Sequence, residues 1–240
     1  MSTFRQCPQK FKFNKIDQIP DSPSEATLLG NFVHEILEDF YALPNEERTI
    51  LTVKTLASQV WHRSDWENRV AGWVRPEDLR RFRWNAWWCV ENLWKIENPK
   101  QIMPKGIESE LHGALGKATV KGFIDRYESM DDGRIRISDY KTGKTPKKSY
   151  VDDKFIQLRI YAALLSKEVE NITHLQLLYL KDGVNFTYEL NEENNEAIIN
   201  YVTETYEMVE DACRSGVFKF NKSRLCDWCA YKSICPGWKR

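Results

Sequence analysis

Residues 120–141 read VKGFIDRYESMDDGRIRISDYK, with apolar runs on both sides of the turn-forming Asp131-Asp132-Gly133. Such a pattern predicts a β-hairpin. Alternate residues of a strand share one face, so Asp139 and Lys141 project together, and Asp125 on the neighbouring strand can join them. A divalent-metal site that cleaves phosphodiesters needs oxygen ligands and a nearby cation. The stretch therefore predicts paired strands that carry a site of this kind.

A helical region precedes the hairpin. Between Ser24, a capping residue, and Pro44, which stops a helix, apolar residues recur at three- and four-residue spacing. These apolar positions are Leu29, Phe32, Val33, Ile36, Leu37 and Phe40. Further helical segments are expected at 52–66 and 76–97. Together the segments predict a helical subdomain ahead of the sheet.

The pattern after the hairpin mixes helix and strand. We expect a helix at 153–169, strands at 174–180 and 184–190 separated by a Lys-Asp-Gly turn, and a last helix at 191–214. With 240 residues and 42% hydrophobic content, the chain is long enough for a substantial core. We expect a single domain over 1–240. Its parts are a helical insertion at about 45–100, a sheet core at 105–190 and a cysteine segment at 216–240.

The charge and hydropathy of the chain limit where it acts. Its 35 basic and 35 acidic residues give a net charge of +0, so binding of nucleic acid must depend on local patches. No apolar run reaches the roughly 18 residues of a membrane span, and the N-terminus lacks a secretory signal pattern. A cytoplasmic protein without a membrane partner is expected.

Three of the six cysteines are clustered as Cys226-x2-Cys229-x5-Cys235, which is a metal-ligand spacing. A disulfide framework does not fit a cytosolic chain of this length. Spacing alone favours zinc, which accepts four thiolates. Cys89 and Cys213 fall inside helical segments and are expected to be buried small hydrophobic residues.

Four motifs occur in a fixed order along the chain. They are Gly30-x3-His34-x2-Leu37-Glu38, Gly122-x2-Asp125-Arg126, Asp139-Tyr140-Lys141-Thr142-Gly143 and Gln157-x3-Tyr161. This order resembles the PD-(D/E)xK nucleases of the RecB type, a group that includes CRISPR-associated adaptation nucleases and stand-alone RecB-like exonucleases. The resemblance spans nearly the whole chain. It implies a restriction-endonuclease-like α/β fold, in which helices flank a mixed sheet.

The resemblance also implies residue roles. Asp125 and Asp139 would ligate Mg²⁺ or Mn²⁺, with His34 as a further ligand and Tyr140 also among the metal-binding residues. Lys141 would orient the attacking water and offset charge on the phosphate. The alternative for His34 is a structural histidine between helix and sheet, and the alternative for the Asp-x-Lys pair is an ordinary surface salt bridge.

Two further groups extend the predicted site. Gln157 and Tyr161 lie one helical turn apart and can reach a phosphate or a water; alternatively, Tyr161 belongs to the core and Gln157 to the surface. Lys144, Lys147 and Lys148 form a basic loop that could hold a nucleic-acid backbone, or could simply be solvated.

Cys7, together with Cys226, Cys229 and Cys235, is similar to the ligand set of a [4Fe-4S] cluster in the cluster-bearing branch of these nucleases; zinc is the alternative. Seven tryptophans between Trp61 and Trp94 are interleaved with arginines. Most of them should build the helical core, and one or two could stack on unpaired bases.

Taken together, the resemblance implies a metal-dependent DNA nuclease. We expect a single-stranded DNA exonuclease of repair or recombination, in which a metal-activated water hydrolyses the phosphodiester bond. Its expected partner is DNA, preferably single-stranded or with a free end, and a helicase or CRISPR-adaptation protein is a further candidate partner. The alternatives are a CRISPR adaptation nuclease that trims DNA with partners, a non-catalytic DNA-binding subunit that bears the cluster, and an enzyme that cleaves RNA.

Overall fold

The computed structural model describes residues 1–238 and divides the chain into two compact units. The larger unit comprises Ser24–Gly113 and Thr119–Ile198 and contains most of the sheet. The smaller unit comprises Met1–Pro23, Ala114–Ala118 and Ile199–Arg240 and contains the cysteines near both ends of the chain.

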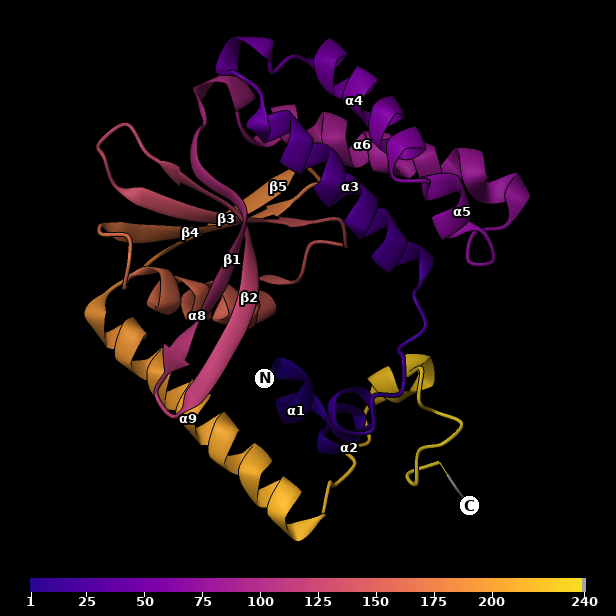
Figure 1. Ribbon diagram of the computed structural model, residues 1–240, viewed down its shortest axis with the longest axis vertical. Coiled ribbons are helices and arrows are strands. Elements are labelled where there is room, and N and C mark those ends of the chain that lie inside the picture. Colours follow the sequence, from indigo (N-terminus) through magenta and orange to yellow (C-terminus); the bar gives the residue numbers. More distant parts are fainter. Residues whose placement is uncertain (239–240) are drawn as a thin grey trace. The chain divides into compact units, whose positions relative to one another are not determined.

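Five strands form one sheet in the order β1-β2-β3-β4-β5. They are β1 Met103–Leu115, β2 Ala118–Ser129, β3 Ile135–Lys141, β4 Ile172–Tyr179 and β5 Val184–Glu189. β2 and β3 are antiparallel and joined by the expected turn, in which Gly133 has a φ of +79°. β3 and β4 are parallel, with Lys141 opposite Tyr179, and β5 is antiparallel to β4. Figure 1 shows this mixed sheet with its flanking helices, which confirms the expected α/β fold class.

Four helices build the core on one face of the sheet. They are α3 Glu25–Ala42, α4 Ile50–Arg63, α5 Trp66–Val70 and α6 Leu79–Ile96. α3 begins where the sequence predicts, because the Ser24 hydroxyl accepts a 3.1 Å hydrogen bond from the Thr27 N–H. Apolar side chains of the four helices share one hydrophobic cluster with Tyr140 of β3 and Leu178 of β4.

The connection from β3 to β4 contains α7 Val151–Lys154 and α8 Ile156–Leu165, and α8 contacts both strands. Tyr140 packs with the helical cluster described above. Because side chains alternate along a strand, Asp139 and Lys141 project from the opposite face, which α8 covers. The strand pattern therefore directs Asp139 and Lys141 away from the Tyr140 side chain.

The smaller unit gathers both ends of the chain. It contains α1 Ser2–Gln6, α2 Pro8–Phe11, a π-helical turn Lys12–Ile16, most of α9 Glu192–Ser215 and a 3-10 helix Arg224–Trp228. Its small core joins Phe4 to Ala212 and Phe218. Arg5 adds polar contacts, donating a 2.7 Å hydrogen bond to Thr205 and forming a 3.2 Å ion pair with Glu204. The N-terminal helices are thus fixed to α9.

Some expectations differ from the structure. The helix expected at 52–66 ends at Arg63, because Asp65 adopts a left-handed conformation with a φ of +50° before α5 begins. The helix expected at 153–169 is divided at Phe155 and ends at Leu165.

Cys89 is buried as expected, but Cys213 is exposed, so its prediction as a buried residue was wrong. Within residues 1–238, no helix has the length and apolar character to span a membrane.

Candidate metal centre and active site

Asp125 and His34 meet where α3 approaches the sheet. Asp125 Oδ2 accepts a 2.7 Å hydrogen bond from the backbone N–H of Tyr140 and lies 3.5 Å from His34 Nδ1. His34 Nε2 lies 3.0 Å from the Tyr140 carbonyl oxygen. Gly30 permits this approach, because a Cβ there would lie only 3.3 Å from Thr142 Oγ1. The first and third sequence motifs are therefore adjacent in space, with the Tyr140 backbone between them.

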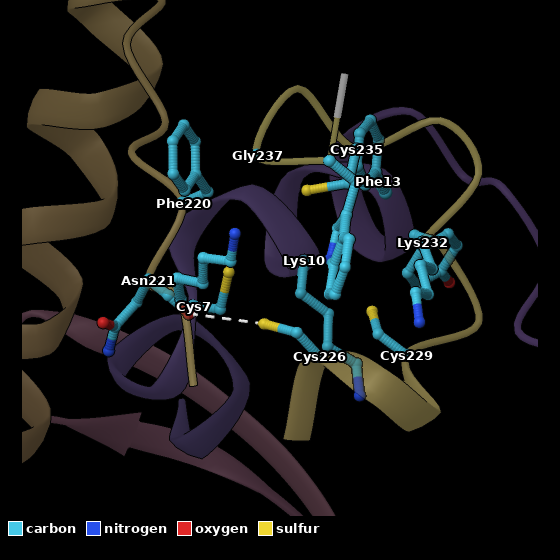
Figure 2. Close-up of a pocket in the computed structure, with 13 residues that line it drawn as sticks. Cys7, Lys10, Phe13, Phe220, Asn221, Cys226, Cys229, Lys232, Cys235 and Gly237 are labelled. Carbon is cyan, nitrogen blue, oxygen red and sulfur yellow. Dashed lines mark hydrogen bonds between the residues drawn. The ribbon is translucent and has the colours of Figure 1, made fainter. Parts of the chain in front are cut away.

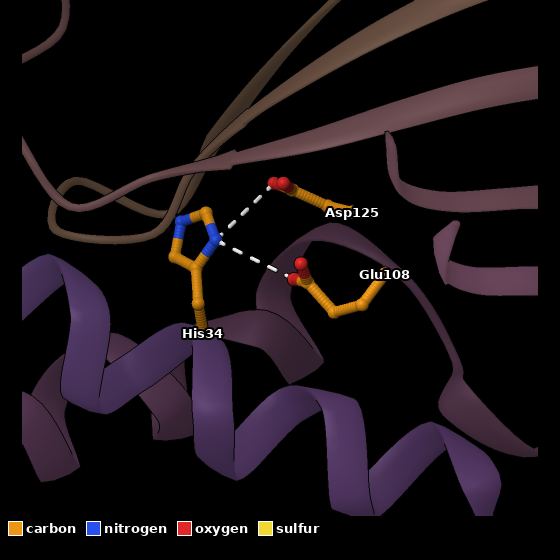
Figure 3. A group of neighbouring side chains, drawn as sticks. All are labelled: His34, Glu108 and Asp125. Atoms are coloured by element: carbon orange, nitrogen blue, oxygen red, sulfur yellow. Dashed lines mark ion pairs between the residues drawn. The ribbon is translucent and has the colours of Figure 1, made fainter. Parts of the chain in front are cut away.

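Glu108 of β1 adds a carboxylate that the sequence analysis missed. Its Oε1 lies 4.0 Å from His34 Nδ1, and donor atoms of Glu108, His34 and Asp125 all lie within 4.8 Å of one another (Figure 3). Glu108 has a φ of +43°, an uncommon conformation for a residue other than glycine. Two carboxylates and an imidazole suit a Mn²⁺ ion well, and their oxygens also suit Mg²⁺. The residues present therefore fit a divalent cation.

Asp139 and Lys141 form an ion pair beside this group. Lys141 Nζ lies 2.5 Å from Asp139 Oδ2, an oxygen that forms no well-aligned hydrogen bond within the described residues. Burial and the charge of Asp125 raise the pKa of Asp139 to about 6, although Lys141 opposes the shift. Burial lowers the pKa of Lys141, but Asp139 outweighs burial and raises it. An acid that is difficult to ionise and a firmly protonated lysine thus share one face of β3.

The acids near His34 also affect one another. Burial raises the pKa of Glu108 to about 7, and the neighbouring charge of Asp125 adds to this shift. Burial lowers the pKa of His34, but its contact with Asp125 and the charges of Asp125 and Asp139 raise it to about 9. Three carboxylates therefore lie close enough to repel one another. A bound cation would relieve this repulsion.

A buried polar network supports the opposite face of the same strands. Arg126 is fully buried and donates to both carboxylate oxygens of Glu97 at 2.7 and 2.9 Å, to Glu128 at 3.0 Å and to the Tyr140 hydroxyl at 2.9 Å. The Tyr41 hydroxyl also donates to Glu97. The Tyr140 side chain therefore belongs to this network, whereas its backbone N–H and carbonyl face the candidate metal site.

Gln157 and Tyr161 come together on α8. Gln157 Nε2 donates a 2.8 Å hydrogen bond to the Tyr161 hydroxyl. The Tyr161 ring packs on β2 at Gly122, where a Cβ would lie 2.4 Å from a ring carbon. Gly122 is three residues before Asp125, so the pair lies near the strand that carries this carboxylate. Within the described residues, the observed contacts join Gln157 and Tyr161 to each other and to β2, and none joins them to Asp139 or Lys141.

The four cysteines of the predicted cluster line one pocket of the smaller unit. Figure 2 shows Cys7, Cys226, Cys229 and Cys235 around this pocket, with Phe13 and Phe220 among its apolar walls. Trp238 also lines the pocket. A zinc ion holds its thiolates at about 2.3 Å, which places tetrahedral sulfurs only about 3.8 Å apart. In the part of the chain that the structure describes, no three of the cysteine sulfurs lie within 4.8 Å of one another. The described cysteines therefore share a pocket without three sulfurs at the spacing of a closed zinc site.

The tryptophans between Trp61 and Trp94 differ in exposure. Trp61 and Trp66 are buried, and Arg83 and Arg69 stack on them at 4.9 and 3.7 Å from the ring centroids. Trp87 and Trp94 pack against the same core. The exposed ones are Trp73, Trp84 and Trp88. As expected, most of the tryptophans build the helical core.

One protein-family model and two phage proteins match this chain over nearly its whole length. The model of the PD-(D/E)XK nuclease superfamily matches residues 1–236. The chain is 24% identical to the Gene 69 protein of Mycobacterium phage L5 and 24% identical to the Gene 69 protein of Mycobacterium phage D29. Each alignment covers 100% of this chain and 95% of the phage protein.

A solved structure shares the fold. A crystal structure from Eubacterium rectale, described as that of a "Putative exonuclease", superposes with a TM-score of 0.59 and 13% sequence identity. The superposition covers 94% of this chain and 80% of that protein. At this identity, the similarity is one of fold.

Proposed function

Because the chain belongs to the PD-(D/E)XK nuclease superfamily, we propose that it is a metal-dependent deoxyribonuclease that degrades DNA from a free single-stranded end. The observation that carries this proposal is the convergence of His34, Glu108 and Asp125 beside the ion pair of Asp139 and Lys141. Nitrogen and carboxylate donors of this kind suit Mn²⁺ or Mg²⁺.

His34, Glu108 and Asp125 would hold the cation, with Asp139 and the Tyr140 carbonyl next to them. When bound, the ion would lower the pKa of a water molecule and neutralise charge on the phosphate. The protein's own side chains would position the water and the phosphate. Lys141 keeps its positive charge because Asp139 raises its pKa, so its ammonium can hold a water or a phosphate oxygen.

Gln157 and Tyr161 are proposed to assist at the α8 side of the sheet. Their 2.8 Å hydrogen bond fixes the two side chains relative to each other, and Gly122 leaves the space that the Tyr161 ring occupies. A fixed amide and hydroxyl near β2 could orient a phosphate group or the attacking water. Replacing Tyr161 by Phe should therefore lower the rate of hydrolysis more than it lowers DNA binding.

For the smaller unit, we propose a [4Fe-4S] cluster bound by Cys7, Cys226, Cys229 and Cys235. The four cysteines line one pocket, and the similarity of this ligand set to that of the cluster-bearing nucleases favours a multi-iron cluster over zinc. Such a cluster would tie the N-terminal helices to the C-terminal segment. Anaerobically purified protein should contain iron and sulfide and lose both in Cys226→Ser, whereas Cys213→Ser, at an exposed cysteine outside the pocket, should keep both. Zinc without iron would contradict the proposal.

The test of the nuclease proposal is cleavage of end-labelled single- and double-stranded DNA, and of RNA of the same sequence, with Mn²⁺, Mg²⁺ or EDTA. Metal-dependent loss of the single DNA strand by the wild type, absent in Asp139→Ala and Lys141→Ala, is the expected result. Shortening of the labelled strand from one end would establish the exonuclease mode. If no metal supports cleavage although DNA binds, the chain is a non-catalytic DNA-binding subunit.

A further inference from the structure

Two large aromatic side chains of α6 are exposed beside each other. Trp84 and Trp88 are separated by one helical turn and are 61% and 45% exposed. They line a groove of about 430 Å³. Its other lining residues are Leu29, Asn85, Cys89, Lys181 and Asp182. Ligand pockets are typically about 300–1,000 Å³, so the groove is large enough for small flat groups.

The groove has a fixed wall opposite the tryptophans. Asn92 of α6 is buried and donates hydrogen bonds to the carbonyl oxygens of Leu180 and Lys181 at 2.9 and 3.0 Å. Asp182 accepts two hydrogen bonds from Thr145, at 2.8 Å from the N–H and 2.7 Å from the hydroxyl. The turn between β4 and β5 is thereby held against α6 and against the loop that follows β3.

The groove adjoins the candidate active site through α3. Leu29 lines the groove, and its neighbour Gly30 lies against Thr142, which directly follows Lys141. One turn further along the same helix is His34. A chain bound across Trp84 and Trp88 would therefore lie close to the end of β3 that carries Lys141.

Lysines lie at and near the groove, beside one acidic residue, Asp182. Lys181 lines it, and Lys181 and Lys144 both lie close enough to Asp182 to lower the pKa of this carboxyl, after its hydrogen bonds with Thr145. Lys95 Nζ lies 5.4 Å from the centroid of the Trp88 ring. Lysines beside exposed aromatic rings match a polyanion that also presents flat, apolar bases.

We propose that Trp84 and Trp88 form a stacking platform for the unpaired bases of single-stranded DNA, with Lys181, Lys144 and Lys95 contacting its phosphates. The inference rests on the proposed nuclease function and names the residues that would recognise its unpaired strand. Bases in a duplex are stacked on each other and cannot reach such rings. Trp61 and Trp66 cannot serve, because they are buried and already covered by arginines.

The test is equilibrium binding in EDTA, so that no strand is cleaved. The probe is a fluorescein-labelled oligodeoxythymidine of about 20 nucleotides, which exceeds the site size of common single-strand modules. The double variant Trp84→Ala/Trp88→Ala should bind at least about tenfold more weakly than the wild type. Trp84→Phe/Trp88→Phe keeps two aromatic rings and should retain most of the affinity. Trp73→Ala removes a 46% exposed tryptophan that does not line the groove and should bind like the wild type.

A strand with abasic sites identifies the bases as the contacted groups. The wild type should bind the abasic strand more weakly than the normal strand, whereas the double alanine variant should bind both strands equally. Equal binding of the normal strand by the wild type and the double alanine variant would overturn the platform and leave the groove to a protein partner. Tighter binding of an RNA strand than of the DNA strand would overturn the assignment of DNA.

A parallel cleavage assay separates this inference from the proposed function. It measures cleavage of the same oligonucleotide by the wild type in Mn²⁺. If the wild type does not cleave the strand but binds it more tightly than the double alanine variant does, the nuclease proposal is contradicted and the platform stands. If the wild type cleaves the strand and both proteins bind it equally, only the platform is contradicted.

Discussion

The backbone N–H of Tyr140 donates a 2.7 Å hydrogen bond to Asp125 Oδ2, which ties the carboxylate of β2 to the strand that carries Asp139 and Lys141. Strand pairing thus orients a candidate metal ligand through the backbone. In Asp125→Asn, the amide oxygen can still accept this hydrogen bond, but the negative charge is lost. We expect the Mn²⁺ affinity and the rate of hydrolysis to fall by at least about a hundredfold. Even the mutation of a residue that only supports a metal ligand typically lowers metal affinity or activity by about 10–100-fold.

Calorimetric titration of Mn²⁺ and the initial rate of strand cleavage measure the effect of Asp125→Asn. The unfolding temperature in EDTA should stay close to that of the wild type, because the hydrogen bond is kept and the loss of repulsion with Asp139 and Glu108 offsets the loss of the ion pair with His34. Wild-type Mn²⁺ affinity in this variant would remove Asp125 from the metal site.

Glu108 offers a test of a ligand that the sequence did not reveal. In Glu108→Gln, a neutral amide replaces a carboxylate that lies 4.0 Å from His34 Nδ1. We expect weaker binding of Mn²⁺ and a smaller increase in unfolding temperature when Mn²⁺ is added, because a ligand stabilises the folded state according to its affinity. The matched control is Glu110→Gln on the same strand, whose carboxylate pairs with Lys121 at 2.9 Å and is half exposed. If both variants bind Mn²⁺ equally well, Glu108 is not a ligand.

Arg126 is expected to contribute to stability and not to metal chemistry. Arg126→Met leaves the Glu97 carboxylate buried without its ion-pair partner and leaves Glu128 with Arg136 as its remaining arginine partner. Breaking a buried ion pair typically costs about 3–5 kcal/mol. Tyr140→Phe removes only one hydrogen bond of this network and should cost roughly 1 kcal/mol. Urea unfolding in EDTA compares the two variants. If Arg126→Met and Tyr140→Phe have equal free energies of unfolding, the ion pairs of Arg126 contribute no more to stability than one hydrogen bond does.

The sequence predicts the parts of the fold that depend on local signals. α3 begins after the Ser24 cap and ends before Pro44, and the hairpin turn contains Gly133 with its positive φ. These features depend on residues a few positions apart. The boundary at Asp65 could not be predicted, because its left-handed conformation interrupts an otherwise helical pattern.

The candidate site is predictable where one strand or one helical turn sets the geometry. Asp139 and Lys141 project together because they alternate with Tyr140 along β3. Glu108 was missed because its approach to Asp125 and His34 depends on how β1 and α3 lie against β2, and no short motif encodes that. The exposure of Trp84 and Trp88 likewise depends on which face of α6 the other helices cover.

Asp139 is expected to make the stability of the metal-free protein depend on pH. Burial and Asp125 raise its pKa to about 6, above the value of about 3.9 in an unfolded chain. The folded state then binds a proton more tightly, so the metal-free protein loses stability as the pH rises from about 4 to 6. Asp139→Asn removes this cost and should increase the free energy of unfolding by roughly 1–3 kcal/mol at about pH 8, with no gain below about pH 4, while hydrolysis is lost.

Urea unfolding in EDTA at both pH values measures the effect of Asp139→Asn. The control is Asp132→Asn in the exposed hairpin turn, where Arg134 lowers the pKa of the carboxyl and no gain is expected. A gain of equal size at both pH values would contradict an ionisation effect at Asp139.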